Sequence, residues 1–209
     1  YLDLIKPLKR KDQVLIESNL TEERKRCERA IKLAEEGIKV ALISSGDSGF
    51  YGMAGLLLEL IQKVNKEFRP SFEVHPGISS MQLAAALGGA PLMNDFCAIS
   101  LSDKLTPWEA IEKRILGALL GDFVIAIFNP KSVDRNWQFK RAIELCLESR
   151  SRDTPVLVAR QVGRQNQSKS FFKLDSIPFK DIDMLSIIII GNSKTTLVDE
   201  IFLTPRGYL

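Results

Sequence analysis

The 209-residue sequence has little histidine and little cysteine. His75 is the single histidine, which excludes any site that needs two, and we interpret it as a strand-end residue making one backbone hydrogen bond. The three cysteines, Cys27, Cys97 and Cys146, are far apart and lie among apolar neighbours. This pattern is typical of buried thiols in a reducing cytosol rather than of a metal cluster. We therefore expect a cytoplasmic protein with no metal site.

The sequence also lacks a strong charge imbalance and long apolar runs. With 29 Lys and Arg against 26 Asp and Glu, the net charge is +3, which is too even to indicate a nucleic-acid partner. A membrane helix needs about 18 consecutive apolar residues, and the most apolar stretches, at 123–128 and 187–190, have only the length of strands. Since 45% of the residues are hydrophobic, the chain can still bury one large core or two smaller ones. We expect a globular protein with no nucleic-acid and no membrane partner.

Nucleotide-phosphate motifs are absent as well. No G-x-x-x-x-G-K-[ST] string occurs, and the loop that begins at Gly46 does not fit G-x-G-x-x-G. Kinases and dinucleotide-dependent enzymes are therefore disfavoured.

What the sequence does contain is a regular alternation of helix and strand patterns. Apolar residues at helical spacing predict helices, and short apolar runs that end in turn residues predict strands. The predicted helices are 21–37, 53–64, 81–87, 136–147 and one that begins at Thr106, and the predicted strands are 39–45, 72–75, 96–101, 123–128, 155–159 and 185–190. Thr106 and Glu109 have the spacing of a capping box, with Pro107 at the first helical position. Glycine and proline at 88–91 indicate a boundary between an α/β domain at 1–90 and another at 91–209.

Glycine-rich or polar turns follow four of the predicted strands. They are Gly46-Asp47-Ser48-Gly49, Pro76-Gly77-Ile78-Ser79-Ser80, Asn129-Pro130 and Gly191-Asn192-Ser193. In open α/β sheets the ligand crevice lies beyond the carboxyl ends of the strands, so together these turns indicate a small-molecule site, although each alone fits an ordinary turn. Arg160, Arg164 and Arg206 either form a solvated face or grip carboxylates, and without a ligand in view the solvated face is the simpler interpretation.

Taken together, these strings resemble the tetrapyrrole methylase family, and within it the enzymes that methylate carbon 17 of precorrin-3B and their anaerobic cobalt-factor counterparts. The matching strings are the residues from Ser44 to Ala54, Pro76-Gly77-Ile78-Ser79-Ser80, the segment from Ala90 to Trp108, Phe128-Asn129-Pro130, Gly191-Asn192-Ser193 and Thr204-Pro205-Arg206-Gly207-Tyr208. The likeness covers nearly the whole chain. The Gly-Asp loop and the Pro-Gly-x-Ser turn are family-wide, whereas Tyr-Gly-Met-Ala, Ser-Leu-Ser-Asp and Thr-Pro-Arg-Gly-Tyr resemble the carbon-17 enzymes specifically.

The resemblance implies two α/β domains, usually in a homodimer, with S-adenosylmethionine in a ligand cleft between the domains. The family's cofactor contacts correspond, by matching motif, to Ser45, Gly46, Asp47, Phe50, Tyr51, Ser79, Ser80, Asn129, Val162, Gly163, Thr204 and Pro205. Family members begin with a strand and a Gly-x-Gly-Pro-Gly-Asp loop, and nothing similar precedes Tyr1. We expect this segment to be missing from the sequence rather than from the protein.

The resemblance also implies a reaction: methylation of carbon 17 of a tetrapyrrole with ring contraction, in cobalamin biosynthesis. Methyl transfer from a sulfonium is an in-line displacement that needs no protein nucleophile. Asp47 and Asp103 are the candidates for proton transfer. A substrate that carries carboxylates makes Arg160, Arg164 and Arg206 candidate substrate clamps. Two alternatives stay open: a family member acting on another corrin carbon, a protein or an RNA, and a non-catalytic small-molecule-binding module.

Overall fold

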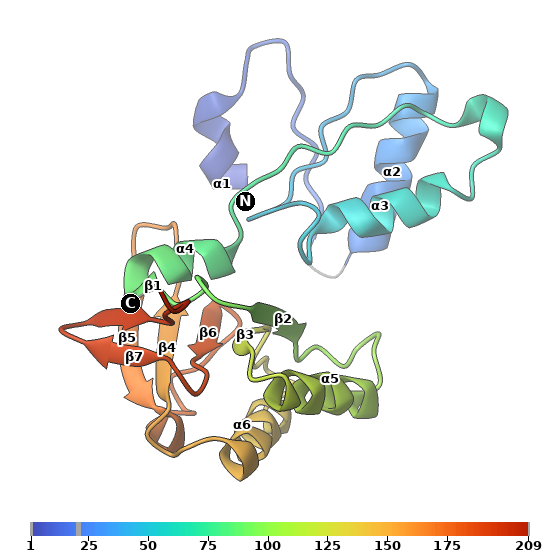
Figure 1. Cartoon of the computed structure of the whole chain (residues 1–209). Coiled ribbons are helices and arrows are strands. Elements are labelled where there is room, and N and C mark those ends of the chain that lie inside the picture. The colour runs from blue at the N-terminus through green and yellow to red at the C-terminus, as the bar shows by residue number, and fades with distance from the viewer. Residues whose placement is uncertain (1, 20–21, 209) are drawn as a thin grey trace. The chain divides into compact units, whose positions relative to one another are not determined.

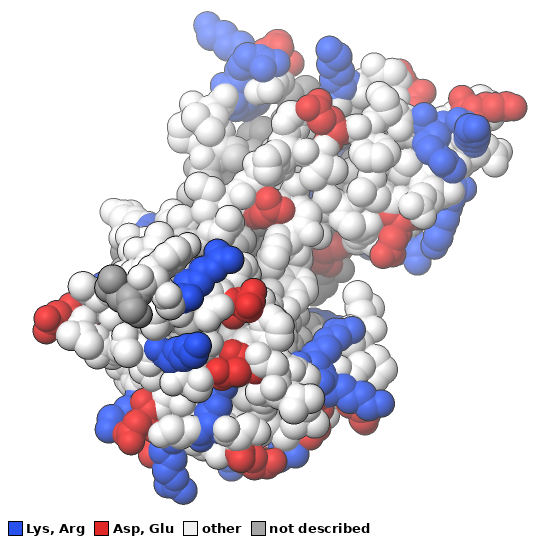
Figure 2. Space-filling view, viewed as in Figure 1, with Lys and Arg blue, Asp and Glu red and all other residues white. Residues whose placement is uncertain are grey.

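The computed structural model describes residues 2–19 and 22–208. The chain divides into two compact units, Tyr1–Ser79 and Ser80–Leu209. The domain boundary that we placed after residue 90 lies further along the chain and stays a prediction. No helix in the described residues is both long and apolar enough to cross a membrane. On the face drawn in Figure 2, basic and acidic side chains are interspersed.

The first unit contains helices joined by long extended segments. Its elements are α1 (Leu2–Ile5), η1 (Lys6–Leu8), α2 (Glu23–Glu35), α3 (Met53–Ile61) and η2 (Lys66–Phe68). Helices α2 and α3 lie side by side (Figure 1), and α2 buries Cys27, Ala30 and Ile31 at the spacing expected of one helical face. The two longer helices confirm the prediction, although Thr21, the predicted start of the first, lies outside the described residues.

The two strands predicted in the first unit are wrong. Residues 39–45 and 72–75 have no strand assignment, and no described residue pairs with them in a β-ladder. A strand is stabilised by hydrogen bonds from its neighbours, so an apolar run without a paired neighbour stays an extended segment. Its apolar side chains are accordingly half exposed, for example Val40 at 39% and Phe72 at 56%.

The second unit is built on a five-stranded sheet. Its strands, in spatial order, are β2 (Phe96–Ser100), β3 (Val124–Phe128), β6 (Ser186–Ile190), β4 (Pro155–Arg160) and β5 (Ser168–Lys173). Strands β2 and β3 are parallel, and β6 runs antiparallel to both β3 and β4. Strands β2, β3 and β4 therefore point in the same direction, and their carboxyl ends meet at one edge of the sheet. We call this the carboxyl edge.

Helices cover both faces of this sheet (Figure 1). Helices α5 (Trp108–Leu120) and α6 (Trp137–Ser149) share a core with Ile188 and Ile190 of β6. Since side chains alternate along a strand, Ile187 and Ile189 face the other way, and they are buried too. On that side lie α4 (Ser80–Gly88) and a small sheet of β1 (Gly89–Ala90), β8 (Ile201–Leu203) and β7 (Thr196–Val198).

Most elements of the second unit confirm the prediction. Helix α6 buries Phe139, Ala142, Ile143 and Cys146, which is the predicted apolar stripe. The predicted cap of α5 is wrong: the helix begins at Trp108, with Pro107 as its extended N-cap residue and no side-chain capping bond. The carbonyl of Pro107 accepts the first helical hydrogen bonds, so the proline lies one position earlier than predicted.

Candidate functional site

In the first unit, Asp47 joins the two turns that the sequence singled out. Its Oδ2 accepts a hydrogen bond from the backbone N–H of Gly77 at 2.9 Å, and its Oδ1 accepts one from Gly49 at 2.8 Å. These backbone donors, Gly77 first and then Gly49, lower the pKa of Asp47 below its ordinary value. The carboxylate is therefore ionised at neutral pH and ties the loop after residue 45 to the loop after residue 75.

Glycine is required where these two loops meet. A Cβ at Gly77 would lie 2.1 Å from the carbonyl oxygen of Gly46, and a Cβ at Gly52 would lie 2.5 Å from the carbonyl oxygen of Ser48. The hydroxyl of Ser48 also donates to the carbonyl of His75 at 3.1 Å. The loops thus contact each other through backbone atoms, which leaves their backbone within reach of a ligand.

The other predicted residues of the first unit surround this contact. Phe50 and Tyr51 stack edge to face at 5.3 Å, and Tyr51 has a left-handed backbone with φ of 55°. Ser45 is exposed, whereas Ser79 is buried. The backbone carbonyl of His75 accepts a hydrogen bond in the loop contact while its imidazole is exposed, but His75 does not end a strand, so that part of its interpretation is wrong.

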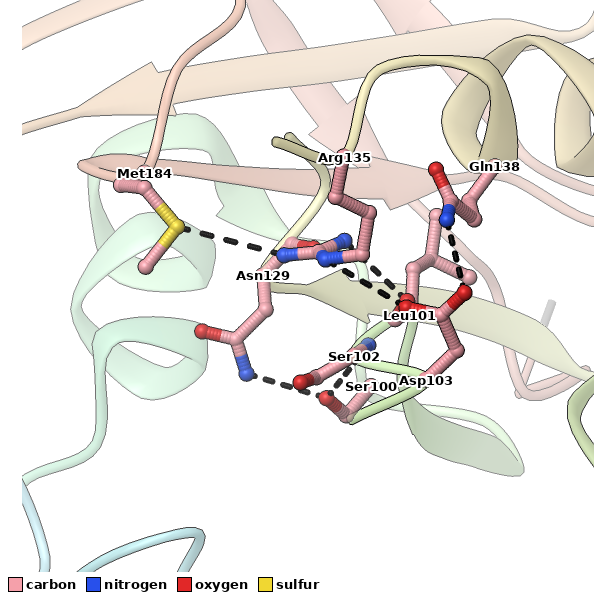
Figure 3. A network of polar contacts seen from close by, with 8 residues as sticks. All are labelled: Ser100, Leu101, Ser102, Asp103, Asn129, Arg135, Gln138 and Met184. Atoms are coloured by element: carbon pink, nitrogen blue, oxygen red, sulfur yellow. Dashed lines mark hydrogen bonds and ion pairs between the residues drawn. The ribbon is translucent and has the colours of Figure 1, made fainter. Parts of the chain in front are cut away.

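In the second unit, Asn129 lies at the carboxyl edge, directly after β3. Its backbone is left-handed, with φ of 50°, and its side-chain amide donates to Ser100 Oγ at 3.0 Å. The Ser100 hydroxyl also accepts from the backbone N–H of Ser102 at 3.2 Å. The ends of β2 and β3 are therefore linked by side chains, and in Figure 3 the amide oxygen of Asn129 points away from the other labelled side chains.

Asp103 lies in the loop that follows β2, beside Asn129 at the same edge. Its Oδ2 accepts a hydrogen bond from Gln138 Nε2 at 2.8 Å, and its Oδ1 lies 4.0 Å from Arg135 Nε (Figure 3). Its side chain is 28% exposed, so the carboxylate keeps contact with solvent. Sequence reasoning missed Gln138 and Arg135, because nothing in the pattern marks a polar side chain at the start of α6 as buried.

Arg160 also ends a strand at the carboxyl edge, but its guanidinium already has a partner. Its Nε and Nη2 both donate to Asp183 Oδ2, at 2.8 and 2.6 Å. Asp183 lies just before β6, which starts at this edge because it runs antiparallel to β4. The sequence did not predict Asp183 as a partner of Arg160. A substrate carboxylate would have to share the Arg160 guanidinium with Asp183.

The turn after β4 contains the remaining loop residues. Gly163 has φ of 74°, and its N–H donates to the side chain of Gln167 at 3.1 Å. Val162 is half buried, and Arg164 is exposed. Two more backbone bonds, from Arg164 to Gln161 and from Gln167 to Arg164, give this turn a defined shape.

The carboxyl-terminal residues differ in how accessible they are. Thr204 is fully buried, and its hydroxyl lies 2.8 Å from that of Thr195, so its side chain contacts the protein interior. Pro205 is half buried and accepts a weak bond from Asn94 at 3.5 Å. Arg206 is exposed and lines a shallow hollow of about 270 Å³ together with residues 92–96.

The turn at 191–193 is not at the carboxyl edge, contrary to the expectation from the sequence. Ile190 pairs with Ile125 near the start of β3, so the antiparallel direction of β6 places its end at the opposite edge. There Ser193 donates its hydroxyl to Asp122 at 2.5 Å, and the Asn192 amide donates to the Asp122 carbonyl at 3.0 Å. This turn therefore serves as a structural link between β3 and β6.

The whole pattern of loops can be compared with known families. A family model for tetrapyrrole (corrin/porphyrin) methylases matches residues 2–178. The chain belongs to the tetrapyrrole methylase family. The predicted α/β fold class is confirmed with it.

Two of the curated relatives to which the chain is similar are named for methylation of carbon 17. The chain is 48% identical over 199 residues to a protein of Salmonella typhimurium named as a probable cobalt-factor III C(17)-methyltransferase. The matched region covers 94% of this chain and 81% of the relative. It is 37% identical over 214 residues to a precorrin-3B C(17)-methyltransferase of Sinorhizobium sp, covering 100% of this chain and 84% of the relative. The chain spans 39% of the length of a third relative, a cobalt-factor III methyltransferase of Priestia megaterium.

The chain is also similar in fold to a methyltransferase of known structure. The crystal structure of the methyltransferase CobJ superposes with a TM-score of 0.91 at 36% identity, covering 98% of this chain and 86% of that one. At this level of similarity the fold corresponds along nearly the entire chain.

Proposed function

We propose that this protein is an S-adenosylmethionine-dependent methyltransferase that methylates carbon 17 of precorrin-3B or of cobalt-factor III, with ring contraction, in cobalamin biosynthesis. The observation that carries the proposal is the 48% identity, over 94% of the chain, to a relative named for this reaction. The loop joined by Asp47 and the carboxyl edge around Asn129 supply polar groups of the kind such a site needs.

The residues present fit an amino-acid nucleoside as cofactor. Glycine backbones at the Asp47 loops allow close approach, and the amide oxygen of Asn129, which accepts no hydrogen bond from the residues that the structure describes, can accept one from a ligand. We assign cofactor binding to these predicted residues: Ser45, Gly46, Asp47, Phe50, Tyr51, Ser79, Ser80, Asn129, Val162, Gly163, Thr204 and Pro205. Because the Thr204 hydroxyl is engaged with Thr195, Thr204 would contribute its backbone. When bound, S-adenosylmethionine supplies the electrophilic methyl group.

The two candidate carboxylates have different surroundings and hence different proposed roles. Both oxygens of Asp47 accept backbone hydrogen bonds, which suits a residue that shapes the cofactor loop. Asp103 is held by one amide and partly open to solvent, which suits a residue that accepts or donates a proton at its Oδ1. We therefore propose Asp103 as the proton-transfer residue and Asp47 as a cofactor-loop residue.

The proposed function is tested by combining two measurements on the full-length protein. Calorimetric titration with S-adenosylhomocysteine should show one site, and incubation with S-adenosylmethionine and either precorrin-3B or cobalt-factor III should give a singly methylated tetrapyrrole by mass spectrometry. Comparing the two substrates distinguishes the cobalt-free route from the cobalt-containing one. Binding of S-adenosylhomocysteine without methylation of any tetrapyrrole would favour a binding module, and methylation of a protein or RNA would favour another family activity.

Arg206 provides a test of the substrate site. Arg206→Glu is expected to raise KM for the tetrapyrrole by about tenfold, because a lost charge-assisted hydrogen bond to a carboxylate has an effect of this size. Affinity for S-adenosylhomocysteine should stay unchanged. Arg114→Glu, an equal charge change at an exposed position of α5, is the control and should alter neither value. If Arg206→Glu weakened both ligands equally, Arg206 would have a folding role instead.

A further inference from the structure

Arg135 is a buried arginine just before helix α6, outside the set of residues discussed so far for ligands. Its side chain is 5% exposed. Its Nη1 donates to the carbonyl oxygen of Leu101 at 3.1 Å and to that of Asn129 at 2.5 Å. Its Nη2 lies 3.9 Å from the sulfur of Met184, a weak acceptor. The guanidinium thus lies among the loops that leave β2 and β3 at the carboxyl edge (Figure 3).

The two carbonyls belong to the residues that directly follow β2 and β3. The ladder between β2 and β3 extends one step further, because the N–H of Leu101 donates to Phe128. Beyond that step the carbonyls of Leu101 and Asn129 have no ladder partner in the part of the chain that the structure describes, and Arg135 donates to both. Asn129 has a left-handed backbone, with φ of 50°, which asparagine adopts more readily than most residues.

Arg135 also faces the carboxylate of Asp103. Nε of Arg135 lies 4.0 Å from Asp103 Oδ1 and has no hydrogen-bond partner among the described residues. The Oε1 of Gln138, whose amide nitrogen holds the same carboxylate, also lacks a partner there. Burial lowers the pKa of Arg135, and the nearby Asp103 carboxylate opposes this effect. A buried cation with an unused donor is weak evidence for a role in stability alone, and the arrangement therefore fits a role in geometry as well.

We propose that Arg135 is a positioning residue that fixes Asn129 and the loop carrying Asp103 in the arrangement needed for cofactor binding and proton transfer. This inference rests on the proposed function, because Asn129 and Asp103 are functional residues only if the protein is a methyltransferase of this kind. The role is carried by the two carbonyl contacts and by the closeness to Asp103, and it requires no contact between Arg135 and a ligand.

The same sheet offers a matched control at its opposite edge. Arg150 is partly buried, and its guanidinium donates to the carbonyl of Gly191 at 2.5 Å and to the carbonyl of Phe123. Its Nε likewise has no partner among the described residues. Arg135 and Arg150 therefore satisfy two backbone carbonyls each, at opposite ends of β3. Replacing either one should destabilise the fold by a similar amount, but only Arg135 lies near the proposed site.

The experiment compares Arg135→Met with Arg150→Met in the full-length protein. Both variants should lower Tm to a similar extent. Arg135→Met should in addition raise Kd for S-adenosylhomocysteine and lower kcat, each by about tenfold, because two charge-assisted hydrogen bonds are lost at the site. Arg150→Met should keep both values within about twofold of the wild type. Arg135→Lys, which retains the charge and one or two donors, should recover part of the affinity.

Each outcome bears on the proposal. If Arg135→Met and Arg150→Met lower Tm equally and leave the kinetics equally unaffected, Arg135 has only a structural role and the inference is wrong. If the methionine variants do not fold, the same comparison is made between Arg135→Lys and Arg150→Lys, with the same expected difference in Kd. Should the wild-type protein bind no S-adenosylhomocysteine, the proposed function itself fails, and the inference fails with it.

Discussion

Asp47→Ala is expected to lower kcat/KM for methyl transfer by about 100-fold while the protein stays folded. The Asp47 carboxylate accepts from the backbone N–H of Gly49 in its own loop and from that of Gly77 in the other, so alanine removes the bond that shapes the first loop and one of its links to the second. A displacement of about 1 Å between groups that hold a reactive cofactor is enough for a loss of this size. The measurement is steady-state kinetics together with the circular dichroism spectrum of the variant.

Two variants make this test specific. Asp153→Ala removes an exposed carboxylate that pairs with Lys173 at 2.6 Å, and it should change neither activity nor stability noticeably. Asp47→Asn keeps one acceptor oxygen and should therefore lose less activity than Asp47→Ala. Wild-type kinetics in Asp47→Ala would remove this residue from the site.

The lowered pKa of Asp47 also predicts that the stability of the fold depends on pH. Since its pKa is lowered in the folded protein, its contribution is present above the pKa of the unfolded chain, about 3.9, and is lost as the pH falls through the folded value. The Tm difference between the wild type and Asp47→Asn should therefore be largest near neutral pH and shrink below about pH 4. A difference that grew in acid would contradict this account.

Periodicity predicted the helices well because each helix carries its own signal. The buried positions of α6 recur at helical spacing within one segment, so the segment alone determines which face is apolar. The strand prediction for β6 likewise rested on a local signal, the isoleucines at 187–190, all of which are buried.

Relations between segments were harder to predict. The direction of β6 depends on its neighbours, and the sequence pattern is the same for either direction; this is why the turn at 191–193 was assigned to the wrong edge. Residues 39–45 have the composition of a buried strand, but a strand also needs a paired neighbour, which a local pattern does not report.

In the candidate site, too, local patterns were easier to predict than contacts between distant segments. Glycine and Asp in turns have a local sequence pattern, and the structure brings the turns of Asp47 and Gly77 together as expected, although the strands on which that expectation rested do not form. Arg135 has no such signature, because an arginine near a helix start usually lies in solvent and only the tertiary fold buries it. The partner of Arg160 was missed for the same reason: Asp183 is distant in sequence and meets it only through the pairing of β4 with β6.

Gly77→Ala is expected to have an effect on cofactor binding comparable to that of Asp47→Ala, through shape rather than charge. The added Cβ would lie 2.1 Å from the carbonyl oxygen of Gly46, far inside van der Waals contact, and the neighbouring atoms are backbone. The two loops must therefore separate, which should raise Kd for S-adenosylhomocysteine by about 100-fold and destabilise the protein by about 1–3 kcal/mol.

Gly55→Ala is the matched control for this substitution. Gly55 lies in α3, a Cβ there would meet no atom within 4 Å, and alanine favours the helix. This variant should bind S-adenosylhomocysteine as the wild type does and gain about 0.5–1 kcal/mol in stability. If Gly77→Ala bound the cofactor product as tightly as Gly55→Ala, the close contact between the loops at 46–47 and 76–78 would not be needed for the site, and Asp47 would have to act through its charge alone.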